Sequence, residues 1–235
     1  MNSPWQIDFF TGLENAVDMQ DVLDVTLKTI KAFGFDFCGW RSKLPIPLSE
    51  HHYSILHSRE DKFSLQVDSG SYDESPVRRY CSQNSEPISW CGTSDDPIFL
   101  QSPMLWEEYY SSGHYGGWAQ SIIESKNVFS LLFADSSNIL PQKDLDQVDF
   151  KMQWVATAVL SKMNQFRLQP NVALTEREKE ILRWTGDGKS ASDIGQILSL
   201  SHSTVSFHMH NAMRKLNAPN KTAAVVKAIY LKLLY

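Results

Sequence analysis

The chain has 235 residues, of which 42% are hydrophobic, and a formal net charge of −5 at pH 7. No apolar run approaches the roughly 20 residues that span a bilayer, and residues 1–10 lack the basic cluster and long apolar stretch of a secretory signal. Cys38, Cys81 and Cys91 have neither zinc-site spacing nor the even count of a disulfide framework, so we interpret them as small buried residues. We expect a cytoplasmic protein with no membrane partner.

The first part of the chain mixes helical and strand patterns. Apolar residues at helical steps over residues 19–33, followed by Gly34, predict a helix. Short β-branched or aromatic stretches predict the strands of a mainly antiparallel sheet at residues 36–46, 52–56, 117–123 and 128–134. Further helical patterns lie at residues 76–84, 102–111 and 142–166. A receiver domain would alternate parallel strands and helices, so we predict an α+β domain of another kind.

Pro170 and Asn171 interrupt the helical pattern that precedes them. We therefore predict a first domain at residues 1–165, a linker at 166–173 and a second domain at 174–235.

Two helices are predicted at the start of the second domain. Thr175 can cap a helix with Glu178 three residues later, and this capping box predicts a helix over residues 175–185 that ends at Gly186. Ser190 can cap the next helix. Its apolar residues recur on one face: Ile194, Ile197 and Leu198.

A third helix, beginning near Ser201 or Ser203, has two different faces. One stripe is apolar: Val205, Met209, Ala212, Met213 and Leu216. The opposite stripe is polar apart from one aromatic ring: Ser203, Ser206, Phe207, His210 and Arg214. Hydroxyl and imidazole groups can hydrogen-bond base edges, and an aromatic edge can contact a thymine methyl. The order of these helices predicts a helix-turn-helix whose third helix reads the major groove of double-stranded operator DNA.

A fourth helix is predicted over residues 220–234, with Val225, Ile229 and Leu233 at four-residue steps. This stripe is either core or a dimer seam. Symmetric dimers bring two such modules to half-sites one helical turn apart, so we predict a homodimer.

Charge divides the chain at the same boundary. Residues 175–235 carry nine Lys and Arg against five Asp and Glu, whereas residues 1–174 carry thirteen against twenty-two. Only the C-terminal part has the net positive charge that favours binding to a polyanion such as DNA. Lys189, Lys215 and Lys221 lie at or beside predicted helix ends, where they can contact phosphates or serve as ordinary surface charge.

The C-terminal motifs resemble the LuxR-type domain, a four-helix helix-turn-helix module of LuxR-like quorum-sensing receptors and NarL/FixJ-like response regulators. The resemblance covers residues 174–231. It implies that Ser206, Phe207 and His210 take the base-reading places. It also implies backbone contacts by Lys189, Thr204, His208, Lys215 and Lys221. Many relatives have a basic residue on the reading face where this chain has Ser206 and His210, so its operator sequence does not follow from theirs.

The N-terminal part resembles the sensory domain of LuxR-type quorum-sensing receptors, an α-β-α sandwich that holds an acyl-homoserine lactone. The landmarks are Gly34-Phe35-Asp36, Pro76-Val77, Pro87-Ile88-Ser89-Trp90, Trp106-Glu107-Glu108, Gly113 and Gly117-Trp118. The expected fold class is therefore an α+β sensory domain with an antiparallel sheet, followed by an all-α four-helix helix-turn-helix domain.

The polar residues of the lactone site are replaced. In the lactone receptors a Trp, a Tyr four residues on, and an Asp before the Pro matching Pro76 bind the lactone carbonyl, the acyl amide oxygen and the amide N–H. The Asp place is Ser75 here, and Asp73 or Glu74 would substitute only if the loop slides. The other two places fall near Lys62 or Phe63, and near Gln66 or Val67. A buried group without its partner costs on the order of 1 to 3 kcal/mol. Trp90, an apolar wall over the lactone ring, is retained.

Three hypotheses follow for the ligand. The pocket binds a small molecule other than an ordinary acyl-homoserine lactone, or it keeps such a lactone with altered affinity. The third hypothesis is a ligand-independent protein, or an antagonist that pairs with another LuxR-type regulator. The candidate ligand-binding residues are Phe63, Gln66, Ser75, Trp90, Trp106, Trp118 and Ser130. Each aromatic residue alone is equally explained as a core residue.

The sequence gives little support to an enzyme. It has no Gly-rich phosphate loop, paired metal-ligand spacing or nucleophile elbow, so we predict no catalytic site, metal or cofactor. The expected partners are operator DNA and an autoinducer-like small molecule, with RNA polymerase left open as a further partner.

Overall fold

The computed structural model describes residues 4–44, 52–60, 62–68, 70, 72–125, 128–167 and 172–234. The chain forms two compact units, Met1–Asn164 and Gln165–Tyr235. Among the described residues, none of the helices has the length and apolar character to cross a membrane.

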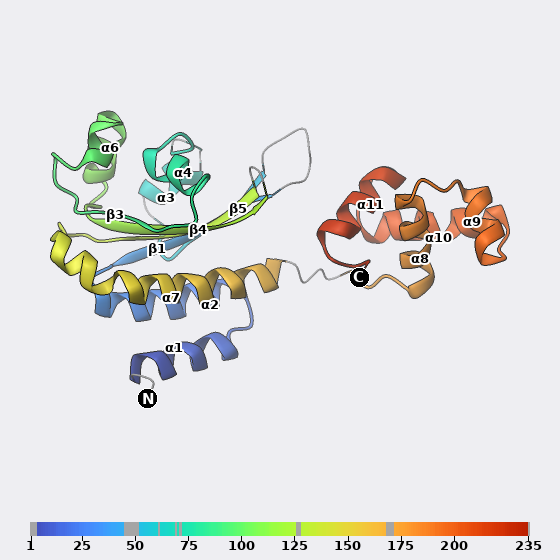
Figure 1. The fold of residues 1–235 in the computed structure, drawn as a ribbon, viewed down its shortest axis with the longest axis horizontal. Helices are drawn as coiled ribbons and strands as arrows, with labels where there is room; N and C mark the ends of the chain where they lie inside the picture. The colour runs from blue at the N-terminus through green and yellow to red at the C-terminus, as the bar shows by residue number, and fades with distance from the viewer. Residues whose placement is uncertain are drawn as a thin grey trace. The chain divides into compact units, whose positions relative to one another are not determined.

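A five-stranded antiparallel sheet is the middle layer of the first unit (Figure 1). Its strands are β1 (Phe37–Leu44), β2 (His52–His57), β3 (Ile88–Trp90), β4 (Gly117–Ser125) and β5 (Val128–Asp135), in the order β2-β1-β5-β4-β3. Arg41 of β1 lies opposite Leu131 of β5, and Phe37 lies opposite Asp135. Because successive side chains point to opposite faces of a strand, Arg41, Leu131 and Asp135 share one face of the sheet.

Helices cover both faces of this sheet (Figure 1). On one face lie α1 (Pro4–Asn15), α2 (Met19–Ile30) and the long α7 (Gln142–Arg167). Shorter helices lie on the other: α3 (Lys62–Asp68), α4 (Pro76–Cys81) and α6 (Pro103–Ser111), with α5 (Pro97–Leu100) just before α6. This is the expected α+β architecture with helices on both sides of an antiparallel sheet.

The chain turns into the sheet at Gly34. The short 3-10 helix η1 (Lys31–Phe33) extends α2, and Gly34 follows it with φ +96°, a conformation that favours glycine. The predicted helix over residues 19–33 therefore ends where Gly34 indicated. The predicted strand 36–46 is described as β1 up to Leu44, and its last two residues lie outside the described part of the chain.

The second unit consists of α8 (Glu176–Gly186), α9 (Ala191–Leu198), α10 (His202–Lys215) and α11 (Lys221–Tyr230). Capping boxes begin α8 at Thr175 and α9 at Ser190, and Ser201 caps α10. Two buried clusters hold the helices together. One includes Leu182, Ala212, Leu216, Ala224 and Ala228, and the other consists of Ile181, Ile194 and Val205. The four predicted helices are confirmed, although the last ends at Tyr230 rather than near residue 234.

Between the units, α7 continues to Arg167, inside the segment predicted as a linker. Residues 168–171, which are half of that predicted linker and include both Pro170 and Asn171, lie outside the described residues.

Candidate functional site

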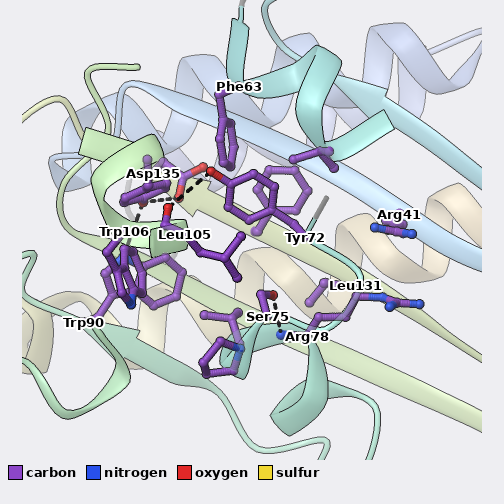
Figure 2. A pocket seen from close by; sticks show the side chains of 15 residues that line it. Arg41, Phe63, Tyr72, Ser75, Arg78, Trp90, Leu105, Trp106, Leu131 and Asp135 are labelled. Carbon is purple, nitrogen blue, oxygen red and sulfur yellow. Dashed lines mark hydrogen bonds between the residues drawn. The ribbon is translucent and has the colours of Figure 1, made fainter. Parts of the chain in front are cut away.

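A cavity of about 80 Å³ lies between the sheet and the short helices α3, α4 and α6 (Figure 2). Most of its lining is apolar or aromatic: Phe63, Val67, Tyr72, Pro76, Val77, Trp90, Leu105, Trp106, Tyr109, Leu131 and Phe133. Four polar or charged residues complete it: Arg41, Ser75, Arg78 and Asp135. A mainly apolar cavity with few polar groups is the usual form of a small-molecule site in proteins.

Two tryptophans form an aromatic wall of this cavity. The Trp90 Nε1–H donates to the backbone oxygen of Tyr115 at 3.1 Å, and the Trp106 Nε1–H donates to that of Ile98 at 3.0 Å. Because both indole N–H groups are satisfied by the protein, the rings offer the cavity apolar surface. Phe63 and Tyr109 continue the wall, with ring centroids 5.4 Å apart.

A buried carboxylate lies at the same end of the cavity. The Tyr109 hydroxyl donates to Asp135 Oδ1 at 2.6 Å, and Asp135 is only 2% exposed. Burial, followed by the charge of Asp135, raises the pKa of Tyr109 well above its ordinary value, so the phenol stays a donor. Within the described residues Asp135 Oδ2 accepts no hydrogen bond, and His114 Nδ1 lies 3.7 Å from it. This oxygen can therefore accept a donor from a bound molecule.

Two arginines lie at the other end of the cavity, away from Trp90, Trp106 and Asp135 (Figure 2). The Arg41 guanidinium donates to the Asp73 carboxylate, and Arg78 Nη1 lies 3.6 Å from the same carboxylate.

The ring of Tyr53 lies beside both cations. The guanidinium carbons of Arg41 and Arg78 are 4.0 Å and 4.8 Å from its centroid. Desolvation by burial, and then the charge of Arg78, lowers the pKa of Arg41.

In the second unit, one face of α10 carries exposed side chains. Ser203, Phe207, His210 and Arg214 are exposed, whereas Ser206 is half-buried. The His210 Nδ1 lies 2.7 Å from the backbone oxygen of Ser206. Because a carbonyl oxygen only accepts, Nδ1 carries the hydrogen and Nε2 is the ring nitrogen left for an outside partner. The opposite face of α10 is buried at Val205 and Ala212, as the apolar stripe predicted.

The sequence profile described as bacterial regulatory proteins of the luxR family matches residues 172–228, and that of the autoinducer binding domain matches residues 18–163. The chain belongs to the LuxR family. It is therefore a transcriptional regulator of the quorum-sensing type, not an enzyme. Its N-terminal domain binds a small molecule, and its C-terminal helix-turn-helix binds DNA.

Two curated LuxR-family proteins align over most of their length. The transcriptional activator protein AnoR of Acinetobacter nosocomialis is 30% identical over 98% of this chain and 99% of its own. The quorum-sensing regulator RhlR of Pseudomonas aeruginosa is 33% identical over 92% and 91%. Among solved structures, SdiA of Escherichia coli in complex with octanoyl-rac-glycerol has the same fold. It gives a TM-score of 0.76 at 22% identity, over 100% of this chain and 98% of that one.

Four of the candidate ligand-binding residues named from the LuxR-family resemblance line the cavity: Phe63, Ser75, Trp90 and Trp106. Ser75 also caps α4, its hydroxyl accepting from the backbone N–H of Arg78 at 3.3 Å. Of the alternative residues in α3, Phe63 and Val67 line the cavity whereas Gln66 does not. The Gln66 amide instead donates to the Glu108 carboxylate of α6.

Trp118 and Ser130 do not line the cavity, contrary to the sequence interpretation. Trp118 is fully buried, and its Nε1–H donates to Asp149 of α7 at 2.8 Å, on the other face of the sheet. The Ser130 hydroxyl is 3.1 Å from that of Ser42. On β5 the cavity-lining residues are Leu131, Phe133 and Asp135. Ser130 and Ala134, the partner of Trp118, alternate with them, so the pleat turns Ser130 and Trp118 away from the cavity.

The predicted DNA-backbone residues differ in their surroundings. Lys189 and Lys221 are exposed, and His208 is half-buried beside Phe207. The Thr204 hydroxyl is 2.8 Å from that of Ser201. Lys215 forms an ion pair within the protein, with its Nζ 2.8 Å from Glu178 Oε2.

The sequence interpretation missed three charged residues of the cavity, Arg41, Arg78 and Asp135. Asp135 directly follows the stretch predicted as a strand, residues 128–134. Counting back in steps of two from Asp135 to Leu131 would have placed it on one face of that strand.

Proposed function

We propose that this LuxR-family regulator responds to a small molecule other than an ordinary acyl-homoserine lactone. The observation that carries this proposal concerns the three polar residues, a Trp, a Tyr and an Asp, that bind the lactone in the lactone receptors. This chain has other residues at the places that the resemblance gives them. Phe63 and Val67, four residues apart on α3, line the cavity, and the resemblance puts the Trp and Tyr of the lactone receptors at these two residues or one residue before each. Neither side chain can donate the hydrogen bonds that a lactone carbonyl and an acyl oxygen accept.

The acceptor for the lactone amide is also altered. Ser75 precedes Pro76 in place of the Asp, and its hydroxyl oxygen already accepts from the N-terminus of α4. Asp73, two residues before Ser75, binds Arg41, and neither it nor the exposed Glu74 is part of the cavity lining. The buried acceptor that the cavity does contain, Asp135, comes from β5 on another wall. A ligand matched to these groups has its polar atoms elsewhere than a lactone does.

As mechanism, the ligand completes the core of the sensory domain and favours a homodimer in the cytoplasm. Dimerisation places two copies of α10 on successive turns of the major groove, with Ser206, Phe207 and His210 towards the base edges. Whether the ligand promotes or releases DNA binding depends on whether it binds more tightly to the state of the protein that binds DNA or to the state that does not.

The melting temperature of the purified full chain tests the ligand proposal. A ligand that binds only the folded state must raise it, so we expect no rise with acyl-homoserine lactones of short to long acyl chains at saturating concentration. Small molecules extracted from the purified protein and added back should raise it. A rise with a lactone alone would overturn this proposal in favour of a lactone receptor of altered affinity.

A further inference from the structure

We propose that the cavity takes a ligand with an anionic head group, bound by Arg41 and Arg78, on a mainly apolar body. This inference rests on the proposed function, because it assumes that the cavity is where the small molecule binds. It goes further by naming the chemical class of that molecule.

Counted over the residues that the structure describes, the arginine end of the cavity carries excess positive charge. The side chains of Arg41 and Arg78 are 5% and 13% exposed, and both line the cavity. Within the described part of the chain they share one carboxylate, that of Asp73, which is 33% exposed and so partly directed to solvent. Glu74, the next acidic residue, is exposed and does not line the cavity. A buried cation without a full counter-charge is costly, and an anion in the cavity would supply that charge.

The same two side chains also keep hydrogen-bond donors unused. Arg41 donates to Asp73 through Nη2, whereas Arg78 donates to the backbone oxygen of Asp73 and to the Tyr53 hydroxyl. The buried Nε–H groups of both arginines have no hydrogen-bond partner among the described residues. Guanidinium groups bind carboxylates and similar planar anions through paired N–H donors. The unused donors therefore fit the oxygens of an anionic head group.

The rest of the cavity sets the length and character of the ligand. Arg41 lies opposite Leu131, and Asp135 is four residues further along β5 on the same face. At 3.3 Å per residue, the two ends of the cavity are about 13 Å apart along the sheet. Apolar and aromatic side chains line the space between them. A ligand of this length reaches Asp135, whose Oδ2 accepts a hydrogen bond from a hydroxyl or amide N–H.

Two compounds of the same shape and different charge test this inference. N-octanoylglycine carries a carboxylate and an amide N–H, whereas its primary amide, N-octanoylglycinamide, is neutral. We expect calorimetry on the full chain to show that the acid binds at least about tenfold more tightly, because a charge-assisted hydrogen bond to arginine is lost in the amide. Arg78→Gln should bring the two affinities close together. Arg79→Gln, a matched control at the exposed neighbouring arginine outside the cavity lining, should keep the difference.

Equal binding of the two compounds to the wild type would overturn the anionic head group and leave the proposed function intact. A full preference for the acid in Arg78→Gln would overturn it in the same way.

If neither compound binds, mass spectrometry of the molecule that copurifies with the full chain decides whether the natural ligand has an anionic head group. An anionic compound that is lost in Arg78→Gln supports the inference, and a neutral one retained in that variant overturns it. If there is no copurifying molecule either, the proposed function itself is contradicted and the inference falls with it.

Discussion

The ammonium of Lys215, at the end of α10, lies 2.8 Å from Glu178 Oε2, in the first turn of α8. The same carboxylate oxygen accepts the backbone N–H of Thr175 at 2.8 Å and so closes the capping box of α8. One buried carboxylate therefore joins the start of the first helix of the DNA-binding unit to the end of its reading helix.

Glu178→Gln is expected to destabilise the C-terminal unit in a pH-dependent way. Burial raises the pKa of Glu178, but the hydrogen bonds from Lys215 and Thr175 outweigh burial and hold the pKa below its ordinary value of 4.5. A depressed pKa in the folded state means that the ionised carboxylate adds stability above pH 4.5, and that this stability is lost as the pH falls through the folded pKa. We expect a loss of about 1 to 3 kcal/mol in unfolding free energy at neutral pH, shrinking in acid.

Hydrogen exchange of the α8 and α10 amides in the full chain measures this change. Glu180→Gln serves as the control, because its ion pair with Arg177 is solvent-exposed and such pairs contribute at most about 1 kcal/mol. A loss in Glu178→Gln that stays the same from neutral to acidic pH would contradict the role given to the ionised carboxylate.

Lys221 and Lys215 are expected to contribute differently to the salt dependence of DNA binding. Lys221 is exposed at the first turn of α11, where the helix N-terminus also favours a phosphate, whereas Lys215 is held by Glu178. In Lys221→Ala, the slope of log affinity against log salt should fall by about 0.9. Lys215→Ala should change it less. Filter binding over a range of salt concentrations measures both slopes, and an unchanged slope in Lys221→Ala would remove Lys221 from the interface.

His210→Ala is expected to change base preference with little effect on folding. The bond from Nδ1 to Ser206 leaves Nε2 as an acceptor in the neutral ring, which suits the amino groups of adenine or cytosine. Losing one such hydrogen bond should cost about 0.5 to 1.5 kcal/mol of discrimination at one base position. Selection of binding sites from random DNA measures this preference. If the variant selects the same bases as strongly as the wild type, His210 does not face the groove.

Ser75→Asp is expected to increase the affinity for acyl-homoserine lactones. Aspartate caps helices as well as serine does, so α4 keeps its N-terminus while the cavity gains the carboxylate of the lactone receptors. A lactone should raise the melting temperature of this variant more than that of the wild type, and Ser75→Ala should show no such gain. If Ser75→Asp and Ser75→Ala respond alike to lactones, the missing carboxylate is not what limits lactone binding.

The sequence predicted the elements with long, regular apolar patterns. The helix predicted at residues 142–166 is α7, Gln142–Arg167, and the capping boxes placed the starts of α8 and α9 correctly. Shorter elements were missed. In α3 only two apolar side chains, Phe63 and Val67, are buried within seven residues, which is too little to show a period.

The cavity was harder to predict than the fold. Almost all of β5 is buried or half-buried, because helices cover both faces of the sheet, so polarity does not indicate which face borders the cavity. This is why Ser130 was placed at the ligand and Asp135 was not. The arginine end joins Arg41 of β1 to Asp73 and Arg78, which begin 32 residues further along the chain, and no local motif connects Arg41 to them.

Selection of genomic DNA fragments by the purified full chain, with its copurifying small molecule present and at moderate salt, tests the central claim that α10 reads operator DNA under the control of a ligand. We expect enrichment of paired half-sites about one helical turn apart, and loss of that enrichment in a Phe207→Ala, His210→Ala double variant that remains folded. Fragments recovered with no preferred sites, or the same sites recovered by the double variant, would contradict it.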